Sequence, residues 1–218
     1  MKTEPVKQRT DDWLKLRRGK FTASEIHKLM GVKFGDDLKD WTATAQNYIL
    51  EKVAETFSDQ SQPLMSKEIA WGLEHEPIGL AHYEGVFGET IEEIGFVLWS
   101  ENTACGCSPD GVVLINDRGI ELKCPYTLKS HIINLMIRSN ADFKRQKPDN
   151  YWQVMSAMMF CKFDAWDFVS FHPYFKPEQR LACIEIVRDD AEFEYMKQRL
   201  HAAVKLRDKL IKEIKNNS

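Results

Sequence analysis

The sequence lacks any long apolar run. None of its apolar stretches approaches a length of about 20 residues, which a membrane-spanning helix needs. The first residues, from Met1 to Pro5, also lack the apolar core of a signal peptide. These absences argue against membrane and secreted proteins, so we expect a protein with no membrane partner that stays in the cytoplasm.

Cysteines are few and their number is odd. Five cysteines fit reduced thiols better than a disulfide framework. Cys105-x-Cys107 resembles half of a zinc site, but no second Cys/His pair stands at ligand spacing, and the alternation fits one face of a strand. The six histidines are scattered, and only His75, beside Glu76, is worth watching. A structural role is favoured there as well, so the sequence does not indicate zinc.

The sequence also has no excess of basic residues. With 30 Lys and Arg against 33 Asp and Glu, its net charge is −3, which argues against a protein that coats nucleic acid by charge alone. The basic residues are nevertheless gathered in two places: Lys15, Arg17, Arg18 and Lys20, then Lys144, Arg145 and Lys147. A local positive track suits an enzyme that must release its product and advance along DNA. It suits ordinary surface charge equally well.

What is present is the pattern of one α/β domain over residues 1–218. Start signals and helical periodicity predict a helix from Thr10 and helices over residues 22–31, 40–57, 66–83, 128–138, 149–162 and 191–215. Alternating or short apolar runs predict strands over residues 90–99, 103–107, 112–115, 119–124, 165–171 and 181–187. Residues 58–65 form a polar loop, and Pro77 marks a kink or a fresh start. This order gives a mixed central β-sheet flanked by helices.

The first predicted helix boundary has a chemical implication. Thr22 and Glu25 form a capping box ahead of an apolar helical pattern, and Gly31 ends that helix. Ser24 then lies in the first turn, with Arg17 nearby, where the positive end of a helix favours phosphate. A well-capped helix without a ligand is the alternative, because capping boxes are frequent.

The stretch from Ser108 to Pro125 carries the clearest chemical pattern. Residues 116–119 read as a hairpin connection between two short strands, so pairing brings Asp110 close to Glu121. Glu121 and Lys123 share one face of the second strand. Two converging carboxylates can bind a hard cation such as Mg²⁺, and an adjacent ammonium can orient water or offset developing charge.

An Asp followed about ten residues later by Glu-x-Lys is also the signature of the PD-(D/E)xK nuclease superfamily. Here it reads Pro109-Asp110, then Glu121-Leu122-Lys123. Charged alternation is common on half-exposed strands, so this motif alone leaves a solvated hairpin face as the alternative.

A longer set of motifs, in the same order, resembles the phage lambda exonuclease family of viral recombination nucleases. The resemblance extends from about Trp13 to Asp190. The motifs are Arg17-x-Gly19-x-x-Thr22-Ala23-Ser24-Glu25, Trp71-Gly72-x-x-x-Glu76, Cys107-Ser108-Pro109-Asp110-Gly111, Glu121-Leu122-Lys123-Cys124-Pro125 and Trp152-Gln153-Val154-Met155.

The resemblance implies a restriction-endonuclease-like nuclease core and a Mg²⁺-dependent enzyme, for which Mn²⁺ would substitute. Such an enzyme degrades linear double-stranded DNA from its ends, 5′ to 3′, and leaves 3′ single strands for recombination by annealing. The resemblance further implies a homotrimeric ring around the DNA and a single-strand annealing protein as partner. Its origin would be a phage or prophage in a bacterial host.

The same resemblance assigns roles to individual residues. Asp110 and Glu121 bind metal together with the Leu122 carbonyl, Lys123 positions the attacking water, and Glu76 adds an acidic group nearby.

The remaining roles concern the reacting centre and the DNA end. Gln153 helps to hold the reacting centre. A pocket for the 5′-terminal phosphate comprises Arg17, Ser24 and Ser108, and Ile69 falls where the family places an apolar wedge that parts the strands.

Two alternatives keep parts of this pattern. A restriction-type or junction-resolving endonuclease of the same superfamily would retain Asp110, Glu121 and Lys123 but would not need a terminal-phosphate pocket. A non-catalytic DNA-binding module on a nuclease fold would tolerate loss of one of these three residues, and all three are present.

Overall fold

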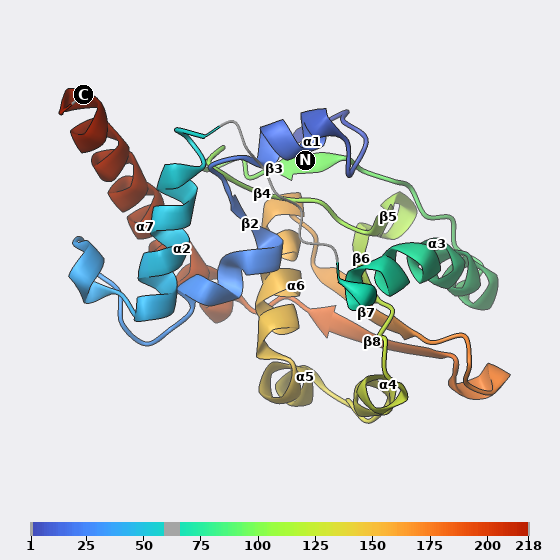
Figure 1. Ribbon diagram of the computed structural model, residues 1–218. Helices are drawn as coiled ribbons and strands as arrows, with labels where there is room; N and C mark the ends of the chain where they lie inside the picture. Colours follow the sequence, from blue (N-terminus) through green and yellow to red (C-terminus); the bar gives the residue numbers. More distant parts are fainter. Residues whose placement is uncertain (1, 59–65, 218) are drawn as a thin grey trace.

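The computed structural model describes residues 2–58 and 66–217, and its strands form two four-stranded sheets with helices around them (Figure 1). The α/β prediction with a mixed sheet flanked by helices is confirmed, and the strands are divided between two sheets. Apart from Ser58, the polar loop expected over residues 58–65 lies outside the described residues. Every helix in the described part of the chain is too short or too polar to span a bilayer.

The first sheet has the strand order β1-β3-β4-β2. Its members are β1 (Lys2–Glu4), β3 (Phe96–Leu98), β4 (Cys105–Cys107) and β2 (Phe21–Thr22). Only the pairing of β2 with β4 is parallel. Strand β1 was not predicted, and the strand expected over residues 90–99 is reduced to β3 and one bridge from Glu92 to Val112.

The second sheet has the order β5-β6-β7-β8 and carries the chemical motif. Its members are β5 (Gly111–Val113), β6 (Arg118–Lys123), β7 (Ala165–Phe171) and β8 (Leu181–Val187). β6 lies antiparallel to β5 and parallel to β7. The predicted hairpin is therefore present. Its connection lies at residues 114–117 rather than at the expected residues 116–119: a short 3-10 turn, η3 (Leu114–Asn116), is followed by Asp117 in the left-handed conformation.

Seven α-helices are described in residues 2–58 and 66–217. They are α1 (Asp11–Arg17), α2 (Ala43–Ala54), α3 (Lys67–Phe87), α4 (Leu128–Leu135), α5 (Asn140–Gln146), α6 (Pro148–Cys161) and α7 (Asp190–Asn216). The buried helix α6 contacts strands of both sheets, while α3 lies against β6 and β8 (Figure 1). The helices α2 and α7 pack together on the side away from α3. The site motif thus lies between α3 and α6.

The predicted capping box at Thr22 is wrong. Residues 23–29 form a seven-residue 3-10 helix, η1 (Ala23–Leu29), and the Thr22 side chain makes no capping hydrogen bond. The Thr22 hydroxyl instead accepts a hydrogen bond from Arg17 Nη2 at 3.4 Å. Glu25 pairs with Lys28 and Lys52 rather than with the backbone. Thr22 and Glu25 therefore form hydrogen bonds and ion pairs with other side chains instead of capping the helix.

Of the two possibilities at Pro77, a fresh start of the helix is absent, because α3 runs through this residue without interruption. Proline removes a backbone donor, yet burial of one helix face can outweigh that loss. Tyr83 on α3 is fully buried in a small core that includes Leu122 of β6 and Phe171 of β7. Packing on the second sheet thus keeps α3 continuous across Pro77 and fixes the position of Glu76.

Close packing of α3 on the sheet depends on Gly79. A Cβ atom at this position would lie 2.8 Å from Leu122 Cδ2 and 3.1 Å from Phe171 Cβ. Gly72 belongs to the same helix, and a Cβ there would meet no heavy atom of the described chain within 4 Å. Substituting each glycine by alanine therefore distinguishes the effect of helix propensity, at Gly72, from the effect of packing, at Gly79.

We expect Gly79→Ala to lower the free energy of unfolding by about 1–3 kcal/mol, because overpacking forces α3 away from β6. Gly72→Ala, the matched control, should raise it by up to about 1 kcal/mol, since alanine favours the helix. Urea unfolding of both variants measures these changes. Equal effects of the two substitutions would show that Gly79 does not set the distance between helix and sheet.

Candidate active site

The β5–β6 hairpin brings Asp110 and Glu121 together. Gly111 pairs with Ile120, so the next residues along, Asp110 and Glu121, are neighbours across the hairpin. The Leu122 backbone N–H donates a hydrogen bond to Asp110 Oδ2 at 2.7 Å. Burial and the neighbouring Glu121 carboxylate raise the pKa of Asp110 well above its ordinary value. The predicted convergence of the two carboxylates is present.

Glu121 is buried and has two side-chain donors. Lys123 Nζ donates to Glu121 Oε1, and Gln153 Nε2 on α6 donates to the same oxygen at 2.7 Å. Burial alone would lower the pKa of Lys123, but the Glu121 and Asp110 carboxylates outweigh it and the net shift is upward. Gln153 is thus brought to the predicted site from 32 residues away in the chain.

The donor set fits a hydrated magnesium ion. In the described residues, no group of three or more His, Cys, Asp and Glu side chains is arranged to hold a metal. Asp110 and Glu121 are two carboxylates at neighbouring positions of the hairpin. Mg²⁺ usually keeps several waters and binds through one or two carboxylates. Leu122, whose carbonyl was the third expected ligand, lines the same cavity. When bound, such an ion polarises a phosphoryl oxygen and lowers the pKa of water.

Glu76 reaches the site from α3. It lines the cavity that contains Asp110, Glu121 and Lys123, and its charge contributes to the raised pKa values of Asp110 and Lys123. Its partner is the guanidinium of Arg9, which the sequence did not indicate. The prediction that Glu76 lies near the metal ligands agrees with this position.

Arg17 lies in the same cavity with both serines expected beside it. Its Nη1 lies 3.4 Å from Ser108 Oγ, and its Nη2 lies 3.4 Å from Ser24 Oγ. The guanidinium stacks 4.2 Å above the Trp13 ring. Burial lowers the pKa of Arg17, although a guanidinium remains charged at neutral pH. The expected α-helix behind Ser24 is instead a seven-residue 3-10 helix, and the full positive charge at this point comes from the Arg17 guanidinium.

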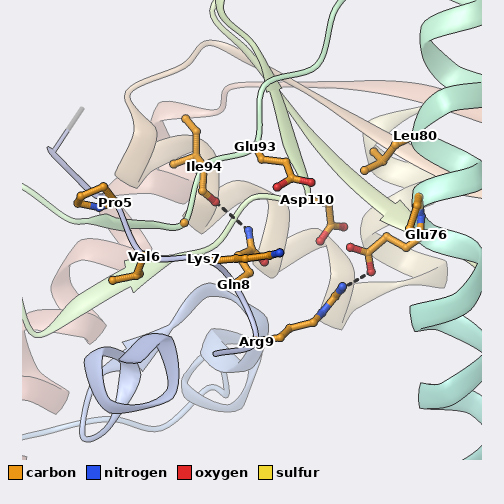
Figure 2. A pocket seen from close by; sticks show the side chains of 12 residues that line it. Pro5, Val6, Lys7, Gln8, Arg9, Glu76, Leu80, Glu93, Ile94 and Asp110 are labelled. Carbon is orange, nitrogen blue, oxygen red and sulfur yellow. Dashed lines mark hydrogen bonds and ion pairs between the residues drawn. The ribbon is translucent and has the colours of Figure 1, made fainter. Parts of the chain in front are cut away.

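Three residues of the N-terminal segment were missed as members of the site. Trp13 Nε1 donates to Ser108 Oγ at 2.8 Å, and Gln8 donates to the Pro109 carbonyl at 2.7 Å. Arg9 extends to Glu76 on α3 (Figure 2). Their order, Gln8, Arg9 and Trp13 ahead of Arg17, was the only available signal. It was weak because no periodic pattern connects residues 8–13 with residues 76 and 108.

Ile69 lies on α3 beside a second cavity, which also includes Lys123 and Glu76. Its side chain is 43% exposed, so it is available to a ligand at the cavity edge. Lys147, from the later basic group, lines the same cavity. Lys144 and Arg145 of that group pair with Glu192 and Asp142, as ordinary surface charges do.

His75 has the structural role that was favoured. Its side chain is buried, with Nδ1 2.9 Å from the Trp71 carbonyl, and its ring stacks on the Trp71 ring at 3.7 Å. Cys105 and Cys107 are both buried on β4, as expected for strand cysteines.

A comparison with protein families shows to which family the chain belongs. The YqaJ-like viral recombinase domain matches residues 12–164. The chain belongs to this family. The predicted relationship to the lambda exonuclease family of viral recombination nucleases is thereby confirmed. No curated protein sequence matches this recombinase-family chain significantly.

Two solved structures share the fold. An alkaline exonuclease from Laribacter hongkongensis, solved alone and in complex with dAMP, is 27% identical, with a TM-score of 0.80 over 95% of this chain and 97% of that chain. A phage-related exonuclease from Haemophilus somnus 129PT is 19% identical, with a TM-score of 0.72 over 89% and 96% of the two chains. The recombinase-family chain is therefore a homologue of an exonuclease along nearly its whole length.

The raised pKa of Asp110 predicts how pH affects stability without metal. The folded chain holds this proton above the ordinary pKa of 3.8, so unfolding releases it, and the free energy of unfolding falls as pH rises. Asp110→Asn removes this dependence. In chelator, the variant should therefore gain stability relative to the wild type as the pH rises above the ordinary pKa of 3.8.

Urea unfolding at several pH values measures this difference. Asp117→Asn, on the exposed hairpin turn, controls for loss of a carboxylate as such. Parallel pH curves for wild type and Asp110→Asn would contradict the repulsion between Asp110 and Glu121.

Proposed function

We propose that the chain is a single-domain, Mg²⁺-dependent exodeoxyribonuclease that degrades linear double-stranded DNA 5′ to 3′. The 3′ single strands that it leaves would serve phage-type recombination by strand annealing. One observation carries this proposal: Arg17, Ser24 and Ser108 line the same cavity as Asp110 and Lys123. Groups suited to bind a terminal phosphate thus share one cavity with groups suited to phosphodiester hydrolysis.

The residues around the reacting centre have distinct tasks. Because the pKa of Lys123 is raised, its ammonium stays protonated and acts as a hydrogen-bond donor and a fixed positive charge. It can orient a water molecule and stabilise charge that develops on phosphoryl oxygens. Gln153 restrains the Glu121 carboxylate through one hydrogen bond and leaves the other oxygen for a cation. Glu76 adds negative charge at the edge of the centre.

Arg17 is suited to bind a phosphate monoester at the DNA end. Its planar fork can give two parallel hydrogen bonds to phosphate oxygens, and the Ser24 and Ser108 hydroxyl groups stand beside it. A 5′-phosphate held there would place the first linkage near Asp110 and Lys123. The complex of the Laribacter hongkongensis exonuclease with dAMP supports binding of a nucleotide by this fold.

The proposal extends to assembly and partners. The net charge of −3 offers no broad basic surface to retain long DNA, and enclosure in a homotrimeric ring would replace it. Light scattering measures the number of chains in the assembly directly, and we expect three. Ile69 would part the strands at the edge of the second cavity, and a single-strand annealing protein would receive the product. Membership of the viral recombinase family supports a phage or prophage origin.

Linear and covalently closed circular duplexes distinguish this function from its alternatives. With Mg²⁺ we expect loss of linear DNA only, and with chelator no loss of either substrate. Lys123→Ala should slow the reaction at least about a hundredfold while DNA ends are still bound. Cleavage of the circle would indicate an endonuclease, and binding without any cleavage would indicate a DNA-binding module.

The terminal-phosphate pocket predicts a preference between DNA ends. A 5′-hydroxyl end lacks the charged group that Arg17 would bind, which costs on the order of 2 kcal/mol, or roughly thirtyfold in initial rate. Initial rates on duplexes with 5′-phosphate and 5′-hydroxyl ends measure this for wild type and for Arg17→Ala. The variant should be slow on both ends. Full discrimination by Arg17→Ala would place the pocket elsewhere.

A further inference from the structure

Arg9 is a second arginine in the candidate active site. Its side chain lines the cavity that also contains Arg17, Asp110 and Lys123. Its Nη2 atom donates to Glu76 on α3, and the side chain remains 47% exposed (Figure 2). A guanidinium has several N–H donors in a planar fork, so pairing with one carboxylate oxygen leaves donors for another anion.

The segment that carries Arg9 is held in place on both sides. The Gln8 amide donates to the Ile94 carbonyl at 2.8 Å (Figure 2). It also donates to the Pro109 carbonyl at 2.7 Å. Pro109 directly precedes Asp110, so the second bond ties Arg9 to the metal-ligand hairpin. Thr10 Oγ1 donates to the Lys7 carbonyl at 2.7 Å on the other side of Arg9.

Arg9 itself has a φ of 66°, a left-handed conformation that is uncommon for a long side chain. Such a conformation costs free energy and persists where the surrounding contacts determine it. The bonds of Gln8 and Thr10 on either side provide this restraint. These contacts fix the backbone at Arg9, and the bond to Glu76 holds its guanidinium in the cavity.

We propose that Arg9 binds an internal phosphate of the degraded DNA strand, at one of the first two linkages from the 5′ end. This rests on the proposed exonuclease function, in which Arg17 binds the terminal phosphate. Glu76 orients the Arg9 side chain by holding one edge of its fork, and the remaining donors bind a non-bridging phosphate oxygen. Arg9 thus sets the position of the strand relative to Asp110 and Lys123.

The experiment measures binding of DNA ends by fluorescence anisotropy, with Ca²⁺ in place of Mg²⁺ to prevent cleavage. The probe duplexes carry a 5′-phosphate and a neutral methylphosphonate at the first or the second linkage. For wild type, one of these substitutions should weaken binding about tenfold, which corresponds to about 1.4 kcal/mol. Arg9→Ala should bind the unmodified end about tenfold more weakly and should not respond further to that methylphosphonate.

Lys7→Ala is the matched control, because it removes one positive charge from the same segment. Lys7 lines the neighbouring pocket rather than the catalytic cavity, so this variant should keep the wild-type response to methylphosphonate. Arg9→Lys keeps a charge that can still pair with Glu76 and should retain part of the response. The slope of the logarithm of the binding constant against the logarithm of salt concentration should become shallower in Arg9→Ala by about one, the value for one phosphate contact. In Arg9→Lys this slope should stay unchanged.

Equal sensitivity of wild type and Arg9→Ala to both methylphosphonates would overturn the proposal and leave Arg9 as a structural partner of Glu76. If Arg9→Ala does not fold, as judged by circular dichroism, an undiminished response in Arg9→Gln overturns it equally. Because binding is measured without cleavage, a protein that binds ends through Arg9 but hydrolyses nothing would refute the nuclease function and not the Arg9 contact.

Discussion

The hydrogen bond from the Leu122 N–H to the Asp110 carboxyl group is the contact on which the candidate site depends. It holds Asp110 beside Glu121, although two buried carboxylates repel each other. Lys123 and Gln153 compensate from the other side by donating to Glu121. Even with these donors the pKa of Asp110 stays raised, so in the absence of a cation a proton on Asp110 relieves the repulsion. In the proposed function, a bound cation would take the place of that proton.

The rest of the fold supports this hairpin from two faces. The small core around Leu122 attaches β6 to α3, and the parallel pairing of β6 with β7 fixes the register of Glu121 and Lys123. On the opposite side, α6 supplies Gln153 from a nearly fully buried helix, so its amide has little freedom to move away. Packing thus converts a local hairpin into a site of defined geometry.

The fold and the site could be predicted from the sequence where the interactions that determine them are local. A hairpin needs only its turn and its alternation, so the proximity of Asp110 to Glu121 could be predicted from residues 108–125. The amphipathic C-terminal helix and the polar position of Gln153 on an apolar helix were equally readable. The neighbourhood of Arg17, Ser24 and Ser108 required the family resemblance, because 91 residues separate Arg17 from Ser108.

Long-range contacts explain what could not be predicted. Gln8 reaches Pro109 across 101 residues, and Arg9 reaches Glu76 across 67, and such pairings leave no periodic trace in a sequence. Thr22 had a plausible local role as a helix cap, but Arg17 competes for its hydroxyl group. The pairing of β1 with β3 adds an edge strand to the first sheet and has no local signature either. Tertiary competition, rather than weak propensity, accounts for these differences.

In the proposed function, the charges of the cavity would couple the binding of metal to the binding of DNA. Three basic side chains and three carboxylates line it: Arg9, Arg17 and Lys123, then Glu76, Asp110 and Glu121. Because the pKa of Asp110 is raised, the metal-free cavity keeps a proton there, and three positive charges face two carboxylates. A divalent cation that replaced this proton would make the cavity more positive and would strengthen the binding of a phosphate, and linkage requires that the phosphate strengthen the binding of the cation equally. Such a cavity would therefore favour a DNA end and its metal together over either one alone.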